Sequence, residues 1–178
     1  MPIHMKNAAP IILWMAALML AGCAGRPLVV EETPWYDRSS GAYDTSDGRV
    51  FYGIGVAGGT RNATLLRATA ANNARKEMAL VLNAFVSELF QSTGTMPSMP
   101  QEDSEQLMGA LVRNALKHAV ISDHWLDAGR MRRYALCRLG LDVFKQVLAS
   151  QTDIDAKTRD AMWAEAENVH ARIEGLQQ

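Results

Sequence analysis

The chain has 178 residues, of which 18 are lysine or arginine and 19 are aspartate or glutamate, giving a formal net charge of −1. This near balance excludes a generally basic nucleic-acid-binding domain, and no nucleic-acid partner is expected. The length is that of one domain with a core of its own.

The N-terminus predicts a bacterial lipoprotein signal. The apolar stretch Ala8–Leu20 has 13 residues, fewer than the roughly 20 needed to span a bilayer but typical of a signal-peptide core, about 7–15. It ends in Leu20-Ala21-Gly22-Cys23, the pattern of a lipobox. We therefore expect residues 1–22 to be removed and Cys23 to become an acylated N-terminus. The alternatives are an ordinary signal peptide with a chance cysteine, or an uncleaved membrane anchor.

An acylated Cys23 predicts the location of the protein. Two or three acyl chains anchor stably, because one chain alone binds only marginally. The residue after the cysteine is Ala24 rather than aspartate, and in bacterial lipoproteins this favours delivery to the outer membrane. The expected partner of the N-terminus is therefore the outer membrane.

Residues 23–48 are expected to form a lipidated flexible tether, since they are polar, contain Pro and Gly, and show little periodicity. Within them, Pro34-Trp35-Tyr36 is expected to dock on the domain surface. A strand is predicted over residues 49–57. Its alternation places Val50, Tyr52, Ile54 and Val56 on one face, and Phe51, Gly53, Gly55 and Ala57 on the other.

The remaining predicted elements also follow apolar periodicity and turn residues. First come a long helix from residue 62 or 64 to 90, a loop over 91–101, and a helix over 104–117 capped by Asp103. Two strands follow, over 119–126 and 131–141, with a turn at Gly129 between them. The chain ends with a short helix over 142–148, begun by Asp142, and a tail helix over 153–176.

These elements predict an α+β fold: a small antiparallel sheet of about three strands, packed by a long helix and a second helix. The domain is expected over residues 49–150, followed by a C-terminal helical segment, 151–178. The tail helix carries an apolar stripe at Met162, Ala166, Val169 and Ile173. This stripe packs on its own domain or pairs with another chain.

The segment Gly53-Ile-Gly-Val-Ala-Gly58 matches the glycine pattern of dinucleotide-binding sites. Such a site also needs an acidic residue at the end of a second strand, about 20 residues on. The nearest candidate, Glu77, falls inside the long helix. The glycines are therefore expected to allow a turn and close packing against the alanine-rich start of that helix, and no cofactor is predicted.

Other patterns give no metal or catalytic site. Glu167-Asn-Val-His170 contains one Glu-x-x-His step, whereas di-iron bundles need two such steps and two further glutamates; a solvated helix face is expected instead. His118 and His124 do not have zinc-ligand spacing. With Cys23 acylated, Cys137 cannot form an intramolecular disulfide. It is expected to be buried, the alternative being an exposed reactive thiol.

A local basic cluster surrounds the predicted hairpin and consists of Arg130, Arg132, Arg133 and Arg138. Charge at this position is typical of a sheet edge protected from aggregation. The alternative is a contact for an anion, a glycan or a partner. The residue types alone leave both interpretations open.

Several segments together resemble a known family. Besides the lipobox, they are Pro34-Trp35, the strand Phe51–Val56, the helix positions Ala68–Ala79, and the late segments Asp123–Trp125 and Tyr134–Leu139. Over about residues 34–148, their order resembles the twenty-kilodalton surface-lipoprotein family (the LPP-twenty antigen type). The resemblance implies an envelope lipoprotein, and Cys23 is the only functional residue that it transfers. Some members are flagellar disk lipoproteins, so a flagellum-associated role is one expectation.

The sequence thus predicts a non-enzymatic, lipid-anchored outer-membrane lipoprotein with a structural or assembly role. We expect it to associate with itself or with an envelope protein. The alternative is a tethered regulator of a cell-wall synthase. A glycan or lipid carrier and an enzyme are weaker hypotheses, because no cavity signature and no convergent catalytic set can be found in the sequence.

Overall fold

A computed structural model describes residues 34–95 and 100–175. The signal peptide 1–22, Cys23 and the first part of the tether lie outside these residues. The described elements are η1 (Trp35–Asp37), β1 (Gly41–Thr45), β2 (Gly48–Ala57), α2 (Ala63–Ser92), α3 (Gln101–Leu116), β3 (Val120–Asp127), β4 (Arg132–Gly140), α4 (Leu141–Ala149) and α5 (Ala156–Gly175).

The fold is α+β, as predicted, but the sheet has four strands rather than three. All neighbouring strands are antiparallel, in the order β1-β2-β4-β3. The additional strand, β1, lies within residues 23–48, which were expected to be tether, so the sheet begins before residue 49. Tyr43 pairs with Val50 across a tight turn. At that turn Gly48 has a φ of 103°, a conformation that glycine adopts easily.

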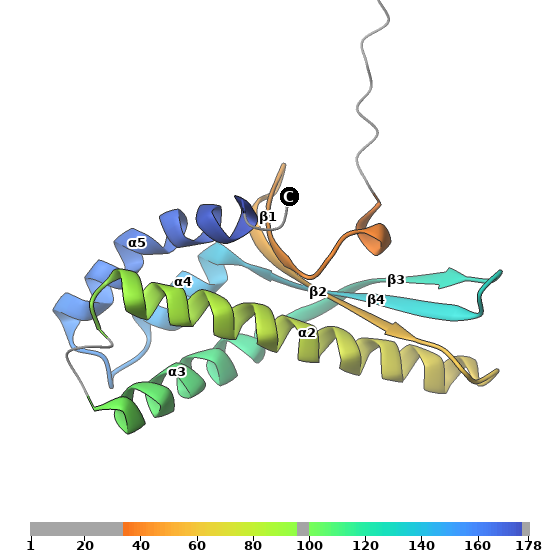
Figure 1. Ribbon diagram of the computed structural model, residues 1–178, viewed down its shortest axis with the longest axis horizontal. Coiled ribbons are helices and arrows are strands. Elements are labelled where there is room, and N and C mark those ends of the chain that lie inside the picture. Colours follow the sequence, from red (N-terminus) through yellow and green to blue (C-terminus); the bar gives the residue numbers. More distant parts are fainter. Residues whose placement is uncertain (1–33, 96–99, 176–178) are drawn as a thin grey trace, which may run out of the picture. The chain divides into compact units, whose positions relative to one another are not determined.

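The helices divide the molecule into two parts (Figure 1). The N-terminal half of α2 lies along one face of the sheet, and its C-terminal half extends beyond the sheet. There α3, α4 and α5 surround it. We call the face of the sheet against α2 the covered face, and the opposite face the open face.

Glycine determines how closely α2 approaches the covered face. Gly53 and Gly55 lie on this face and are buried. A Cβ atom added to Gly55 would lie 2.7 Å from Ala74 Cα, and one added to Gly53 would lie 2.8 Å from Met78 Cβ. Both separations are shorter than carbon atoms tolerate. The expectation that these glycines serve close packing is confirmed.

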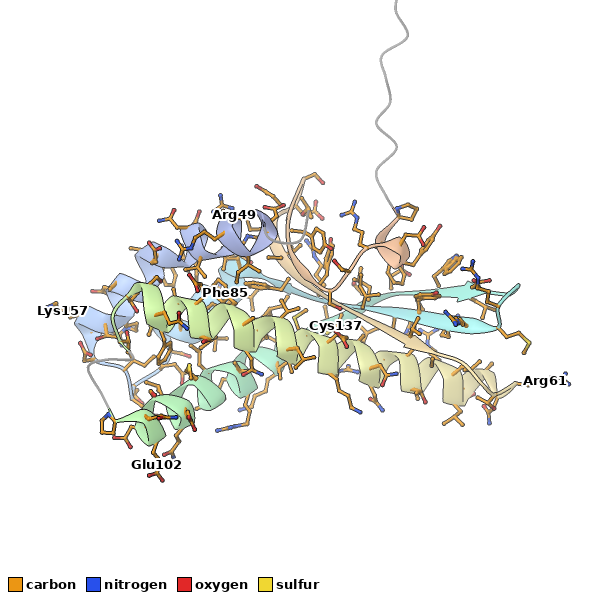
Figure 2. All side chains as sticks on the ribbon, viewed as in Figure 1. Arg49, Arg61, Phe85, Glu102, Cys137 and Lys157 are labelled. Carbon is orange, nitrogen blue, oxygen red and sulfur yellow. The ribbon has the colours of Figure 1, made fainter. Side chains whose placement is uncertain are left out.

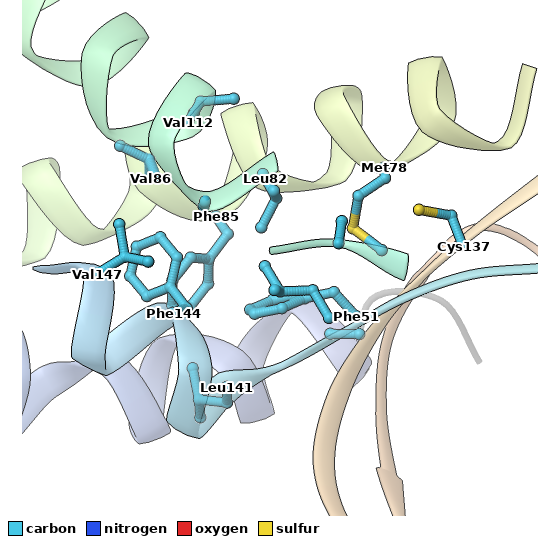
Figure 3. Close-up of a cluster of buried hydrophobic side chains, with 14 of the residues drawn as sticks. Phe51, Met78, Leu82, Phe85, Val86, Val112, Cys137, Leu141, Phe144 and Val147 are labelled. Carbon is cyan, nitrogen blue, oxygen red and sulfur yellow. The ribbon is translucent and has the colours of Figure 1, made fainter. Parts of the chain in front are cut away.

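The core is one continuous cluster, centred on three phenylalanines (Figure 3). Phe85 lies 4.8 Å from Phe51 and 4.9 Å from Phe144 between ring centroids, in edge-on arrangements that aromatic pairs prefer. The α5 residues Met162, Ala166 and Val169 are buried in the same cluster. The apolar stripe of the tail helix therefore packs on its own domain.

The ends of the elements agree with prediction except at the start of α3. Asn62 Oδ1 accepts a hydrogen bond from Leu65 N at 3.0 Å and caps α2. Helix α3, by contrast, begins at Gln101 after Pro100, so Asp103 lies in its first turn rather than at the cap. Between β3 and β4, the turn at residues 128–131 ends in Met131, whose φ is 51°.

Candidate functional site

The predicted lipid-attachment residue, Cys23, lies outside the described residues. The described chain starts eleven residues later, at Pro34. The next two residues, Trp35 and Tyr36, already contact strand β3. Trp35 Nε1 donates a hydrogen bond to Asp123 Oδ2 at 2.8 Å. The Tyr36 ring stacks on Trp125 with centroids 4.0 Å apart and planes 9° from parallel. We call Trp35, Tyr36, Asp123 and Trp125 the N-terminal clamp.

The clamp continues across the open face. Trp125 packs against Tyr134 on β4, with centroids 5.3 Å apart. Further along, the backbone N–H of Ile54 donates to Ser40 Oγ at 2.9 Å, and Tyr43 lies 5.2 Å from Tyr52 between centroids. Contacts of this kind contribute about 0.5–1.5 kcal/mol per aromatic pair. The expectation that Pro34-Trp35-Tyr36 docks on the domain is confirmed.

A large cleft lies at the end of the sheet where β2 begins. It has a volume of about 760 Å³ and is lined by Asp44, Asp47, Gly48, Arg49, Leu141, Asp142, Lys145, Gln146, Trp163 and Glu167. We call this region the cleft. Its walls come from the β1–β2 turn, α4 and α5. The lining includes four carboxylates and two cations, so its net charge is negative.

An ion-pair network crosses the cleft. Glu167 accepts from Arg49 Nη1 and from Lys145 Nζ, each at 3.0 Å. The hydrogen bond and the charge of Lys145 hold the pKa of Glu167 below its ordinary value. Lys145 Nζ also lies 4.7 Å from the centroid of the Trp163 ring, and this indole remains 41% exposed. The cleft can therefore offer carboxylates and an aromatic surface to a cationic or apolar group.

A smaller groove lies at the opposite end, between the start of α2 and the β3–β4 turn. Its volume is about 250 Å³, and it is lined by Arg61, Ala63, Leu66, Leu126, Ala128, Met131 and Arg133. We call this groove and the neighbouring residues 58–67 and 126–133 the tip. Leu126 is 45% exposed and Met131 46%. The tip thus combines exposed apolar side chains with arginines.

The structure separates the residues of the Glu-x-x-His step. Glu167 is exposed in the cleft, whereas His170 is fully buried against Phe51, with ring centroids 5.1 Å apart. The solvated face predicted for both is therefore wrong for His170, because it follows Val169 directly on the buried side of α5. His170 Nε2 lies 3.1 Å from the Val50 carbonyl oxygen. Burial lowers the pKa of His170, so the neutral ring donates its Nε2 proton to that carbonyl.

His118, His124 and Cys137 are the other residues that the sequence singled out, and the structure gives them different surroundings. His118 is exposed at the end of α3, and His124 lies on β3, where burial and then the charge of Arg67 lower its pKa. In the described parts of the chain, no three His, Cys, Asp or Glu residues are grouped to hold a metal ion. Cys137 is fully buried, as predicted, and burial raises the pKa of its thiol to about 11.

The basic cluster does not protect a sheet edge. Three of its members lie on β4, which is an interior strand, so that prediction is wrong. Arg138 lies 3.5 Å from Asp47 on the open face, and the exposed Arg130 lies 3.7 Å from Asp127. Arg132 and Arg133 belong to the tip and form no ion pair with any described residue.

Sequence reasoning missed the cleft and the tip as sites. The cleft joins Asp47, Lys145 and Trp163, which are far apart in the sequence and share no motif spacing. One signal was available: Trp163 is a lone aromatic in an otherwise polar helix. At the tip, the signal was Met131, an apolar residue between arginines in a turn.

No family model matches this chain, and no curated protein matches it. The resemblance to the twenty-kilodalton surface lipoproteins therefore stays a prediction from the sequence. Within residues 34–95 and 100–175, none of the helices has the length and apolarity needed to cross a bilayer.

Proposed function

We propose that this chain is a lipid-anchored envelope lipoprotein, attached through Cys23 to a bacterial outer membrane, with a non-enzymatic role in structure or assembly. The observation that supports this most is the N-terminal clamp. It ties the chain to the sheet immediately after the proposed tether, through contacts between residues nearly ninety positions apart.

The clamp sets an upper limit on the reach of the tether. From Cys23 to Pro34 there are eleven residues, and an extended chain spans at most about 3.3–3.6 Å per residue. With Cys23 acylated, the first residue of the domain lies within about 40 Å of the bilayer. A domain held so close to the bilayer is in position to act at the membrane that anchors it. The clamp can transmit a force from the tether to the sheet.

The same limit counts against the alternative of a regulator that reaches across the periplasm to a cell-wall synthase. Part of the expected tether is folded into η1 and β1, so less of it is left for reaching a distant enzyme. The resemblance to the twenty-kilodalton surface lipoproteins adds the flagellum as one site for an assembly role.

The test is replacement of the proposed attachment residue in the full-length chain. We expect Cys23→Ser to abolish incorporation of a fatty-acid label and to release the protein from membranes. Cys137→Ser is the matched control, because that thiol is buried; it should keep both the label and the membrane fraction. If the wild type takes up no label and Cys23→Ser still sediments with membranes, the proposal is wrong.

A further inference from the structure

The cleft and the tip lie at opposite ends of strand β2. Gly48 lines the cleft, and Ala57 ends the strand beside the tip. A ten-residue strand rises about 3.3 Å per residue and spans about 30 Å. Figure 2 shows the two ends, with Arg49 at the cleft and Arg61 at the tip. One copy therefore cannot bring its own tip into its own cleft.

The two ends carry opposite charge. The tip has five arginines and one aspartate within residues 58–67 and 126–133, a net charge of +4. The cleft lining has four carboxylates and two cations, a net charge of −2. The exposed Arg61 and Arg132 at the tip form no ion pair with a described residue, and neither does Asp142 in the cleft. Complementary surfaces of this kind steer association and fix its orientation.

The two ends also match in their apolar groups. Met131 projects from the β3–β4 turn, 46% exposed, in a left-handed conformation with φ 51° that normally favours glycine or asparagine. Trp163 offers a partly exposed indole in the cleft, and the flexible thioether of methionine packs well on aromatic rings.

We infer that the tip of one copy of this chain docks in the cleft of a second copy, with Met131 against Trp163 and the tip arginines facing Asp47 and Asp142. The contact joins two different surfaces, so each docked pair leaves one tip and one cleft free. Repetition produces a ring if the rotation closes and a filament if it does not. The inference rests on the proposed function, and it specifies which two surfaces of the chain make contact in the assembly.

Two variants of the full-length chain test the contact separately. Arg61→Glu with Arg132→Glu reverses charge at the tip, and Asp47→Lys with Asp142→Lys reverses it in the cleft. All four residues are exposed. In mild detergent, each variant alone should associate at least about tenfold more weakly than the wild type, measured by analytical ultracentrifugation. An equimolar mixture should associate again, because the intact tip of one variant meets the intact cleft of the other, and the two reversed surfaces also carry complementary charge.

Three further variants separate docking from folding. The chain carrying all four reversals restores complementary signs and should associate again. Lys76→Glu with Lys157→Glu is the control for net charge. It changes the net charge of the chain by the same amount as the tip variant, but at exposed helix positions away from both sites, and it should associate like the wild type. Met131→Gly removes the exposed side chain and suits the left-handed turn. It should weaken association about tenfold while leaving the thermal midpoint unchanged or higher.

Wild-type association of both the tip variant and the cleft variant, or no recovery of association in their mixture, overturns the inference but leaves the acylation test of the proposed function unaffected. The same holds if the purified wild type is monomeric. Tip reversals that abolish binding to anionic phospholipid vesicles while association persists would assign the tip to the membrane, and this also overturns the inference. Loss of acylation without loss of pairing would instead contradict the proposed function alone.

Discussion

The two faces of the sheet are built on different principles. On the covered face, Gly53 and Gly55 place backbone directly against α2, and no space remains for a single added carbon atom. On the open face, the clamp consists of partly exposed rings and one exposed hydrogen bond. The covered face therefore determines whether the chain folds. The open face determines where the tether enters the domain, through contacts that are individually small.

The largest difference should appear between neighbouring residues of β2 that point to opposite faces. We expect Phe51→Ala to lower the free energy of unfolding by about 3–5 kcal/mol, because it removes a fully buried ring from the centre of the core. Tyr52→Ala, on the open face, should cost about 1 kcal/mol. Chemical denaturation of both variants checks this. Equal losses would contradict the distinction between the faces.

The next effect concerns the glycines of one motif. Gly55→Ala places a carbon atom against the backbone of Ala74, and we expect a loss of about 3 kcal/mol through overpacking. Gly58→Ala is the matched control, because the nearest atom to its added Cβ would be Arg132 Cγ at 3.7 Å. It should change stability by no more than about 0.5 kcal/mol. Thermal unfolding of the two variants measures the difference.

A smaller effect is expected at the clamp. Trp35→Phe keeps an aromatic ring but removes the hydrogen bond to Asp123, and should cost about 1 kcal/mol. A double-mutant cycle with Asp123→Ala isolates that bond, since Asp123→Ala should cost about 1 kcal/mol less in the Trp35→Phe background than in the wild type. Fully additive losses would mean that the bond does not hold the N-terminal segment in solution.

The smallest expected effect is a pH dependence of stability. The folded protein lowers the pKa of His170, chiefly by burial, so near and below pH 6.5 the unfolded chain binds more protons than the folded one. Stability is therefore highest above about pH 6.5 and falls as the pH is lowered. His124 contributes in the same direction. Between pH 7.5 and 5.5, His170→Gln should show a shallower loss; an unchanged slope would exclude His170 as a source.

Periodicity predicted the elements whose packing is regular. The alternation in β2, the stripe along α2 and the apolar runs around Gly129 all correspond to observed elements. In each of them the apolar pattern repeats over enough residues to distinguish a helix from a strand. The close approach of α2 to the glycine face was also predictable, because small residues occur on both partners.

The missed features depend on tertiary contacts. Strand β1 has five residues that include glycine and aspartate, and its pairing with β2 rather than its own propensity makes it a strand. His170 looked solvated because its sequence neighbours are polar, but the turn of α5 places it on the core. The cleft joins β1–β2, α4 and α5, an assembly that only the fold brings together.

The most direct test of a membrane-anchored assembly role is the size and composition of the complex that mild detergent releases from native membranes. We expect a large species composed mainly of this chain, and its loss in the tip and cleft variants would connect it to the inferred contact. A small species that pairs this chain with a cell-wall enzyme would contradict the assembly role and favour the regulator.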